Sequence, residues 1–269
     1  MTFKLLALDL DETLLDANSQ ISAENQAAIR RAVDKGILVT IATGRMFRSA
    51  LSYARQLKID LPLITYHGAL IRTVSGKDLF YRPVPLIEAR EIIDIVQAQN
   101  LHINVYVHDQ LFVAEENRYT DAYRKFAKVP LKVVGDLQSF LIEPPTKLSI
   151  IGDNKQLVEI QKELWQRYGD KLEIAFSLPQ YLEITDKEAT KGKALAFLAK
   201  MHKIPRQQVA AIGDSYNDIS MLEYAGIGVA VANACADVKA AADIITESNV
   251  NHGVAVFINQ FLDKEDSRR

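Results

Sequence analysis

The chain has 269 residues, of which 48% are hydrophobic and 25% are charged, and its formal net charge is -2. These values are typical of a globular protein that is large enough for one big domain or two unequal ones, and we expect two. The near-neutral charge gives no electrostatic reason to expect nucleic acid as a partner. A small charged molecule fits this composition better.

Targeting signals and metal-binding cysteines are also missing from the sequence. The start, MTFKLLALDLDE, lacks the features of a signal peptide, and no apolar run approaches the length of about 18 residues that a membrane helix needs. We therefore expect a cytoplasmic protein with no membrane partner. The single cysteine, Cys235, rules out an internal disulfide, and the five histidines show no zinc-ligand spacing. Any metal should be a hard ion held by oxygen.

The first predicted element is a buried strand. Leu5–Leu8 form an apolar run that is too short for a helix and suits a strand buried on both faces. The strand ends in two carboxylates, Asp9 and Asp11, at the edge of the sheet where α/β proteins collect their chemistry. One carboxylate could attack a substrate while the other moves a proton. Two adjacent anions need a divalent cation, or cationic side chains from elsewhere in the chain.

Helices and strands then alternate along the chain. Ser22 opens a helical pattern that Gly36 stops. A strand at 37–42, a helix at 47–57 and a strand at 62–66 follow. The first of these strands ends in Thr43, Gly44 and Arg45, and the second is followed by His67 and Gly68. This alternation predicts a doubly wound, parallel α/β sheet.

The alternation breaks at 81–85, YRPVP, where two prolines indicate a linker to a second domain. That domain, at 82–186, is predicted to be an α+β insert. Its helices are expected near 86–99, 119–128 and 155–168, and its strands at 102–107, 110–115, 147–151, 172–176 and 181–184.

The alternation of helices and strands that marks the first part of the chain returns near Thr190. A helix is predicted at 193–202, strands at 209–212 and 227–231, and closing helices at 234–242 and 254–262. The sequence Gly213-Asp214-Ser215-Tyr216-Asn217-Asp218 follows the strand at 209–212. We therefore expect residues 1–81 and 187–269 to form one core domain that the insert interrupts.

Four separate segments place reactive side chains at a predicted strand end or helix start. They carry Asp9 and Asp11, Thr43 and Gly44, Lys191, and Asp214 with Asn217 and Asp218. Taken singly, each has a structural explanation, for example Thr43 as a helix N-cap or Asp214 as a turn former. Together they indicate a single site.

These segments read DLDETLL, ATGR, ATKGKAL and GDSYNDISML. In this order, and with an insertion of this size before the third, the chain resembles the haloacid dehalogenase (HAD) superfamily, in particular its Cof-type phosphatases with a large α+β cap of the C2 type. The resemblance implies a Rossmann-like core with an inserted cap. It also implies a magnesium-dependent phosphatase that hydrolyses small phosphorylated metabolites, such as sugar phosphates, through an aspartyl phosphate.

The resemblance implies a role for each acidic residue. Asp9 is the nucleophile that takes up the phosphoryl group, and Asp11 is the general acid and base. Mg²⁺ is held by Asp9, by the backbone carbonyl of Asp11 and by Asp214, with Asp218 close by or acting through water.

The phosphate-binding residues follow from the same resemblance. Thr43 and Gly44 donate hydrogen bonds to the phosphoryl group, and Lys191 adds a positive charge during its transfer, which makes it a catalytic residue as well. Asn217 and the amide of Leu10 complete this set.

The motifs leave the roles of the residues that would face the substrate open. Arg45 could pair with a substrate phosphate or form a structural salt bridge. His67 stands where related sequences often have asparagine, and it could contact substrate or orient its loop. Glu12 stands where the family commonly has glycine, which adds an anion beside the site. The substrate itself is expected to be chosen by side chains of the cap.

Two other functions share some of these features. A receiver module that is phosphorylated on aspartate also combines acids, a threonine and a lysine, but it would not contain a hundred-residue insert. A phosphomutase of the same superfamily would return the phosphoryl group to a sugar. Release of free phosphate without a bisphosphate activator would distinguish a hydrolase from a mutase.

Overall fold

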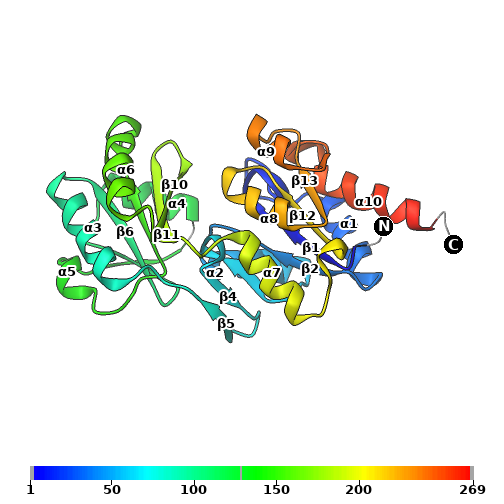
Figure 1. The fold of residues 1–269 in the computed structure, drawn as a ribbon, viewed down its shortest axis with the longest axis horizontal. Coiled ribbons are helices and arrows are strands. Elements are labelled where there is room, and N and C mark those ends of the chain that lie inside the picture. Colours follow the sequence, from blue (N-terminus) through cyan, green and yellow to red (C-terminus); the bar gives the residue numbers. More distant parts are fainter. Residues whose placement is uncertain (1–2, 128, 267–269) are drawn as a thin grey trace. The chain divides into compact units, whose positions relative to one another are not determined.

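The structure is a computed structural model that describes residues 3–127 and 129–266. The chain divides into two compact units (Figure 1). The core unit contains the residues up to Gly44, Ala50–Leu79 and the chain from Thr190 onward. The inserted unit contains Arg45–Ser49 and Phe80–Ala189.

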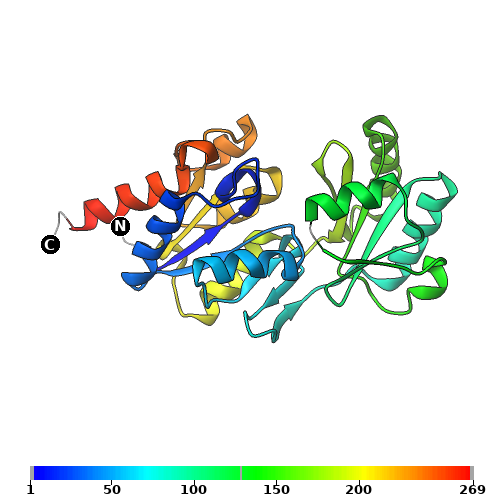
Figure 2. The same ribbon diagram turned by 180° about the vertical axis from the view of Figure 1, so that it is seen from behind.

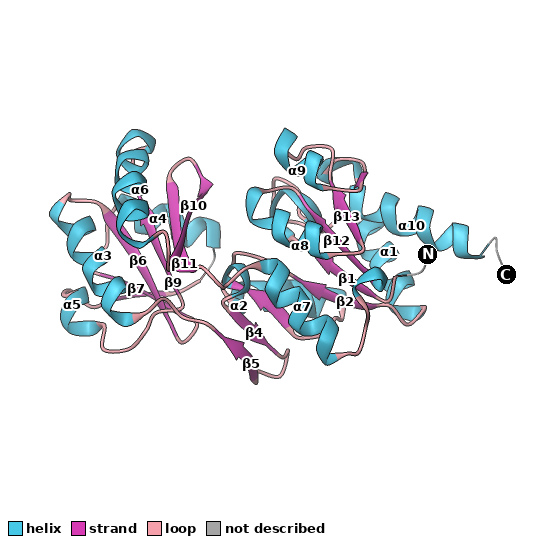
Figure 3. Ribbon diagram, in the orientation of Figure 1, coloured by secondary structure: helices cyan, strands magenta, loops and turns pink. Residues whose placement is uncertain are grey.

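The core unit is built on a parallel sheet of five strands in the order β14-β13-β12-β1-β2 (Figure 3). These strands are β1 (Leu5–Leu8), β2 (Leu38–Ile41), β12 (Val209–Gly213), β13 (Ile227–Ala230) and β14 (Ile244–Ile245). The four residues of the central strand β1 are completely buried, as expected for a strand covered on both faces. Its last residue, Leu8, pairs with Ile41 on β2 and Ile212 on β12. The residues that follow these three strands therefore emerge at one edge of the sheet.

Helices cover both faces of this sheet. The core helices are α1 (Ala23–Asp34), α2 (Phe47–Leu57), α7 (Lys191–Met201), α8 (Ile219–Tyr224), α9 (Ala236–Ala241) and α10 (Gly253–Asp266). Helix α1 packs against α10 on one face, and α7 packs against α8 on the other (Figures 1 and 2). Ser22 caps α1 by accepting a hydrogen bond from the Asn25 amide. This doubly wound α/β arrangement confirms the fold class predicted from the sequence.

A small three-stranded sheet lies beside β2, and the sequence predicted only its first strand. The strand expected at 62–66 is present as β3 (Leu63–Thr65), and a parallel bridge between Ala42 and Ile64 joins it to the end of β2. It continues into β4 (Leu70–Arg72) and β5 (Asp78–Tyr81). Strand β5 reaches into the segment expected to be linker. Its sequence, DLFY, has only three apolar residues in a row, which is too short a run to identify as a strand, and none of its residues is fully buried.

The inserted unit is an α+β structure around a six-stranded sheet in the order β10-β11-β9-β6-β7-β8. Its strands are β6 (His102–Val107), β7 (Gln110–Val113), β8 (Leu131–Val133), β9 (Lys147–Ile151), β10 (Leu172–Leu178) and β11 (Tyr181–Asp186). Its helices are α3 (Leu86–Ala98), α4 (Arg118–Ala127), α5 (Leu137–Phe140) and α6 (Asn154–Tyr168). All neighbouring strands are antiparallel except β7 and β8.

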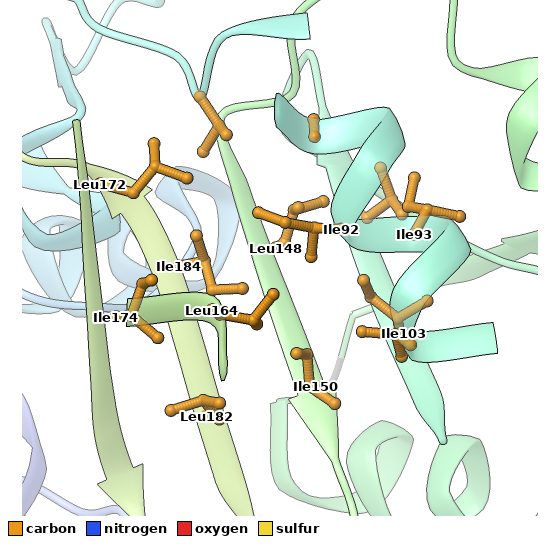
Figure 4. Close-up of a cluster of buried hydrophobic side chains, with 14 of the residues drawn as sticks. Ile92, Ile93, Ile103, Leu148, Ile150, Leu164, Leu172, Ile174, Leu182 and Ile184 are labelled. Carbon is orange, nitrogen blue, oxygen red and sulfur yellow. The ribbon is translucent and has the colours of Figure 1, made fainter. Parts of the chain in front are cut away.

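One face of this sheet forms the apolar core of the inserted unit. Ile103, Leu148, Ile150, Leu182 and Ile184 project from the strands and pack against apolar side chains of α3 and α6 (Figure 4). These strand residues are no more than 3% exposed. Because side chains alternate along a strand, the residues between them lie on the other face.

Within the part of the chain that the structure describes, no helix combines the length and the apolar character that crossing a membrane requires.

Candidate active site

Three buried carboxylates meet at the carboxyl edge of the core sheet. Asp9 follows β1, Asp214 follows β12, and Asp218 lies in the short 3-10 turn before α8. One oxygen of each carboxylate lies within 4.8 Å of the others. The three residues are at most 9% exposed. Parallel strands thus bring together acids that lie more than two hundred positions apart in the sequence.

Lys191 supplies the positive charge among these acids. Its Nζ lies 2.6 Å from Asp9 Oδ1 and 2.6 Å from Asp218 Oδ1, and the side chain is 1% exposed. Lys191 is the first residue of α7, which begins two residues earlier than the sequence pattern predicted. Thr190 accounts for this start, because its side chain accepts a hydrogen bond from the Lys193 amide and caps the helix.

Close packing of α7 on α8 fixes the position of Lys191. The next residue, Gly192, donates its amide hydrogen to Ser220 Oγ at 3.1 Å. A Cβ added at Gly192 would lie 2.1 Å from the Ser220 carbonyl oxygen, which is shorter than any tolerated contact. Only glycine lets the start of α7 approach α8 this closely.

Asp218 holds its neighbours with both carboxylate oxygens. Oδ1 binds Lys191, while Oδ2 accepts the backbone amides of Asp214 and Ser215 at 3.0 and 2.9 Å. The residue is completely buried. This arrangement orients the ammonium of Lys191 and shapes the turn that carries Asp214.

Asp214 is held by two hydroxyl groups that the sequence analysis did not single out. Thr13 Oγ1 donates to Asp214 Oδ1 at 2.7 Å, and Ser215 Oγ donates to Asp214 Oδ2 at 2.9 Å. Thr13 is completely buried, although it belongs to the first motif and lies 201 positions from its partner. The sequence does show a hydroxyl residue two positions after Asp11, but it does not show that this hydroxyl contacts Asp214.

Burial and mutual repulsion change the proton affinities of these groups. Burial, with repulsion from Asp218, Asp214 and Asp11, raises the pKa of Asp9 well above its usual value, and Lys191 opposes this shift. Burial, followed by repulsion from Asp218, raises the pKa of Asp214 to about 6. Burial would lower the pKa of Lys191, but its contacts with Asp218 and Asp9 outweigh that and raise it. The site therefore contains more buried negative charge than its lysine offsets.

The loop after β1 adopts an unusual backbone. The Leu15 amide donates to the Leu10 carbonyl at 2.8 Å, which closes a wide turn over Leu10–Leu14. Glu12 lies within this turn in the left-handed region, at φ 58°. Its carbonyl accepts a hydrogen bond from Asn233 Nδ2 at 2.7 Å. Glycine adopts this backbone more readily than glutamate does, and the exposed position keeps the Glu12 side chain in solvent.

The remaining predicted residues fall into different places. Thr43 is buried at the end of β2, and the amide of His67 donates to its carbonyl at 3.1 Å. The imidazole of His67 lies against Gly44, since a Cβ there would be 2.3 Å from His67 Cε1.

Asn217 lies in the turn between Asp214 and Asp218, and its buried Oδ1 has no hydrogen-bond partner among the described residues. The contacts of Arg45 group it with the inserted unit, where its Nη1 donates to Ser49 Oγ.

This fold and this arrangement of acids around a lysine can be compared with known proteins. The family model of haloacid dehalogenase-like hydrolases matches residues 6–258. The chain therefore belongs to the haloacid dehalogenase-like hydrolases. It is a phosphatase of the Cof type, as the motifs indicated.

Individual relatives match along nearly their whole length. The 5-amino-6-(5-phospho-D-ribitylamino)uracil phosphatase YwtE of Bacillus subtilis is 35% identical over 285 residues, covering 96% of this chain and 98% of that protein. The crystal structure of TM0651 from Thermotoga maritima is 31% identical, with a TM-score of 0.87 and coverage of 96% and 97%. A sugar phosphatase of HAD subclass IIB is 26% identical, with a TM-score of 0.85 and coverage of 96% and 98%.

The three carboxylates also fit the magnesium ion that the family implies. Their oxygens lie close enough together for shared coordination, and Mg²⁺ prefers such oxygen ligands. One ammonium does not offset three buried carboxylates, and burial, together with repulsion among these acids, raises the pKa of Asp9 and of Asp214. Asp214 is the most exposed of the three at 9%, whereas Asp218 is completely buried and uses both oxygens to bind Lys191 and two backbone amides.

Proposed function

We propose that this chain is a magnesium-dependent phosphatase that hydrolyses small phosphorylated metabolites, such as sugar phosphates, through a phosphoryl group carried on Asp9. The observation that supports this most is the contact of Asp9 with Lys191 beside Asp214 and Asp218. A carboxylate held against an ammonium at a strand end is positioned to attack phosphorus. The names of the relatives, which include a ribitylaminouracil phosphatase and a sugar phosphatase, support this class of substrate.

The reaction proceeds in two halves. In the first, an oxygen of Asp9 bonds to phosphorus and the ester bond breaks, while Asp11 gives a proton to the leaving oxygen. In the second, Asp11 takes a proton from water as the water oxygen bonds to phosphorus, and phosphate leaves Asp9. After the second half, Asp9 is again a free carboxylate and Asp11 again carries its proton.

The surrounding residues stabilise the transferring group. Lys191 provides positive charge, and Thr43, Gly44, Asn217 and the Leu10 amide provide hydrogen-bond donors. Asn217 lies in the turn between Asp214 and Asp218, and its side-chain NH₂ group would be one of these donors.

When bound, Mg²⁺ would neutralise charge on the phosphoryl oxygens and on the acids. Asp9, Asp214 and the backbone carbonyl of Asp11 would hold it. Asp218 acts mainly by orienting Lys191 and the Asp214 turn.

In this proposal residues 1–81 and 187–269 form the catalytic core, and the cap at 82–186 selects the substrate. The cytoplasm is the proposed location, since the phosphorylated metabolites of this class are found there.

Removal of the metal tests the proposed function. Phosphate release from p-nitrophenyl phosphate and from a panel of sugar phosphates is expected to fall at least about 100-fold in excess chelator and to recover when Mg²⁺ is added. Ca²⁺ should restore little activity, because its larger and looser coordination shell suits in-line transfer poorly. Circular dichroism in chelator checks that the fold persists. Full activity in excess chelator would contradict the metal assignment.

Thr13 is expected to control metal affinity through Asp214. Thr13→Val keeps the side-chain shape but removes the donor to Asp214 Oδ1. Loss of such an indirect contact typically weakens metal binding about 10- to 100-fold, so the Mg²⁺ concentration for half-maximal activity should rise by that factor. Thr13→Ser retains the hydroxyl and is the matched control. An unchanged Mg²⁺ requirement in Thr13→Val would show that this hydrogen bond does not position a metal ligand.

A further inference from the structure

The loop after β1 is held by asparagine side chains from distant parts of the chain. Three backbone carbonyls accept hydrogen bonds from their Nδ2 atoms: Glu12 from Asn233 at 2.7 Å, Leu14 from Asn25 at 3.4 Å and Leu15 from Asn249 at 2.9 Å. Asn25 lies in α1, Asn233 follows β13, and Asn249 begins the 3-10 turn before α10. The loop that carries Asp11 and Thr13 is therefore fixed by segments from both ends of the sequence.

Two of these asparagines have a structural explanation. Asn25 and Asn249 are 1% and 7% exposed, and the residues whose carbonyls they bind, Leu14 and Leu15, are each 1% exposed. A buried carbonyl without a partner destabilises the folded state, so these two side chains contribute to stability. Asn25 also accepts the Ala255 amide with its Oδ1 at 2.9 Å, which ties the loop to α10.

Asn233 differs from the other two, because both it and Glu12 are exposed. Water can bind an exposed carbonyl in place of a side chain, so the stability of the fold does not depend on this contact. The amide group of Asn233 is nevertheless held in one orientation. Its Oδ1 accepts the backbone N–H of Asn249 at 3.0 Å, which leaves its Nδ2 to donate to the Glu12 carbonyl. Asn233 is thus an oriented donor at a place where solvent would suffice for folding.

The carbonyl that Asn233 binds lies between two functional residues. It belongs to the peptide bond from Glu12 to Thr13, and the Thr13 hydroxyl donates to Asp214. On the other side, Asp11 directly precedes Glu12 and has a non-helical backbone, with ψ 133°. Glu12 itself is left-handed at φ 58°, a conformation that a residue with a Cβ keeps only where surrounding contacts impose it. Rotation of this backbone would turn the Asp11 side chain away from its present direction.

We propose that Asn233 is a positioning residue for the acid and base of the reaction. Its hydrogen bond to the Glu12 carbonyl keeps the left-handed backbone in place, and this backbone directs the carboxyl group of Asp11. Without the bond, Asp11 protonates the leaving oxygen less effectively in the first half of the reaction. It also takes the proton from water less effectively in the second half. This inference rests on the proposed function, in which Asp11 performs both proton transfers.

Asn233→Ala tests the first half of the reaction in the intact protein. The substrates are p-nitrophenyl phosphate and phenyl phosphate, which have similar shapes, but phenolate is the more basic leaving group and needs the acid more. Their kcat/KM values report the reaction up to phosphorylation of Asp9. The ratio of kcat/KM for p-nitrophenyl phosphate to that for phenyl phosphate should rise about three- to tenfold, the effect of losing one hydrogen bond. A merely structural role would lower both values alike and leave this ratio unchanged.

Rapid-quench intact-mass measurement follows the second half. With saturating p-nitrophenyl phosphate, a larger fraction of Asn233→Ala than of the wild-type protein should carry a phosphoryl group, because a misplaced base slows attack by water. The melting temperature should stay close to that of the wild type. Asn154→Ala is the matched control, since Asn154 is also exposed and its Nδ2 also donates to a loop carbonyl, that of Pro179, at 2.7 Å. The control should change neither the ratio nor the phosphorylated fraction.

The ratio of kcat/KM values decides the proposal. If the wild-type protein hydrolyses both aryl phosphates and the ratio is unchanged in Asn233→Ala, the positioning role is refuted and the proposed function stands. An equal rise of the ratio in Asn154→Ala would also refute the positioning role, because the effect would not be specific to the loop after β1. Failure of the wild-type protein to release phosphate from either ester would refute both the positioning role and the proposed function.

Discussion

Asp9→Asn is expected to lose essentially all turnover, by more than about 10⁴-fold, as is typical when a nucleophile is removed. The amide cannot form an aspartyl phosphate, so no substrate should leave a phosphoryl group on this variant. The protein should still fold, because the change removes a buried carboxylate from a cluster of acids that repel one another, and Lys191 keeps its contact with Asp218. Rapid-quench intact-mass measurement, together with phosphate release, checks both halves of the reaction.

Asp11→Asn is the matched comparison, since it makes the same chemical change two residues away. Its backbone carbonyl is retained, and a substrate with a good leaving group can phosphorylate Asp9 without help from an acid. The phosphorylated protein should then accumulate, because no base activates water in the second half. A phosphoryl group on Asp9→Asn would overturn the nucleophile assignment. Undiminished steady-state turnover by Asp11→Asn would overturn the assignment of the acid and base.

Lys191→Met should have the second largest effect, on stability as well as on rate. The ammonium lies between Asp9 and Asp218 and all three side chains are at most 8% exposed. Removing one partner of a buried ion pair typically destabilises a protein by about 3–5 kcal/mol, because charge is left without compensation. We expect a loss of this size in the free energy of unfolding, measured by urea denaturation in chelator. Added Mg²⁺ should restore part of the stability but not the activity.

Lys200→Met provides the control, because Lys200 is an exposed lysine in the last turn of the same helix. Its loss removes a favourable interaction with the helix dipole and should lower the free energy of unfolding by less than about 1 kcal/mol. Equal losses for the two variants would show that the contacts of Lys191 contribute nothing specific. Wild-type turnover by Lys191→Met would rule out its role in phosphoryl transfer.

Much of the core could be predicted because its signals are local. The apolar run Leu5–Leu8, and the acids that end it, lie within a few residues of each other, and the parallel sheet follows from repeated strands and helices. Strand β5 has only three apolar residues in a row, beside the prolines that indicated a linker, and was missed. The hydrogen bond from Thr13 to Asp214 was also missed, because it joins residues that only the finished sheet brings together.

The inserted unit shows a different limit of sequence reasoning. The alternation in HINVYV predicted the strand at 102–107. It could not tell that the polar set, which includes Asn104 and Tyr106, would be buried as deeply as the apolar set. Sequence patterns normally assign polar residues to solvent, so a polar face covered by a helix becomes visible only in three dimensions.

The order of the strands has a consequence for the synthesis of the chain. The central strand β1 pairs with β2 nearby, but its other neighbour, β12, is separated from it by the entire inserted unit. On the ribosome, the contiguous segment Phe80–Ala189 emerges before β12 and contains all the strands of its own sheet. The insert can therefore fold first, and its folding shortens the loop that must close when β12 arrives. The acid cluster, which needs Asp9 and Asp214 together, is consequently one of the last features of the molecule to form.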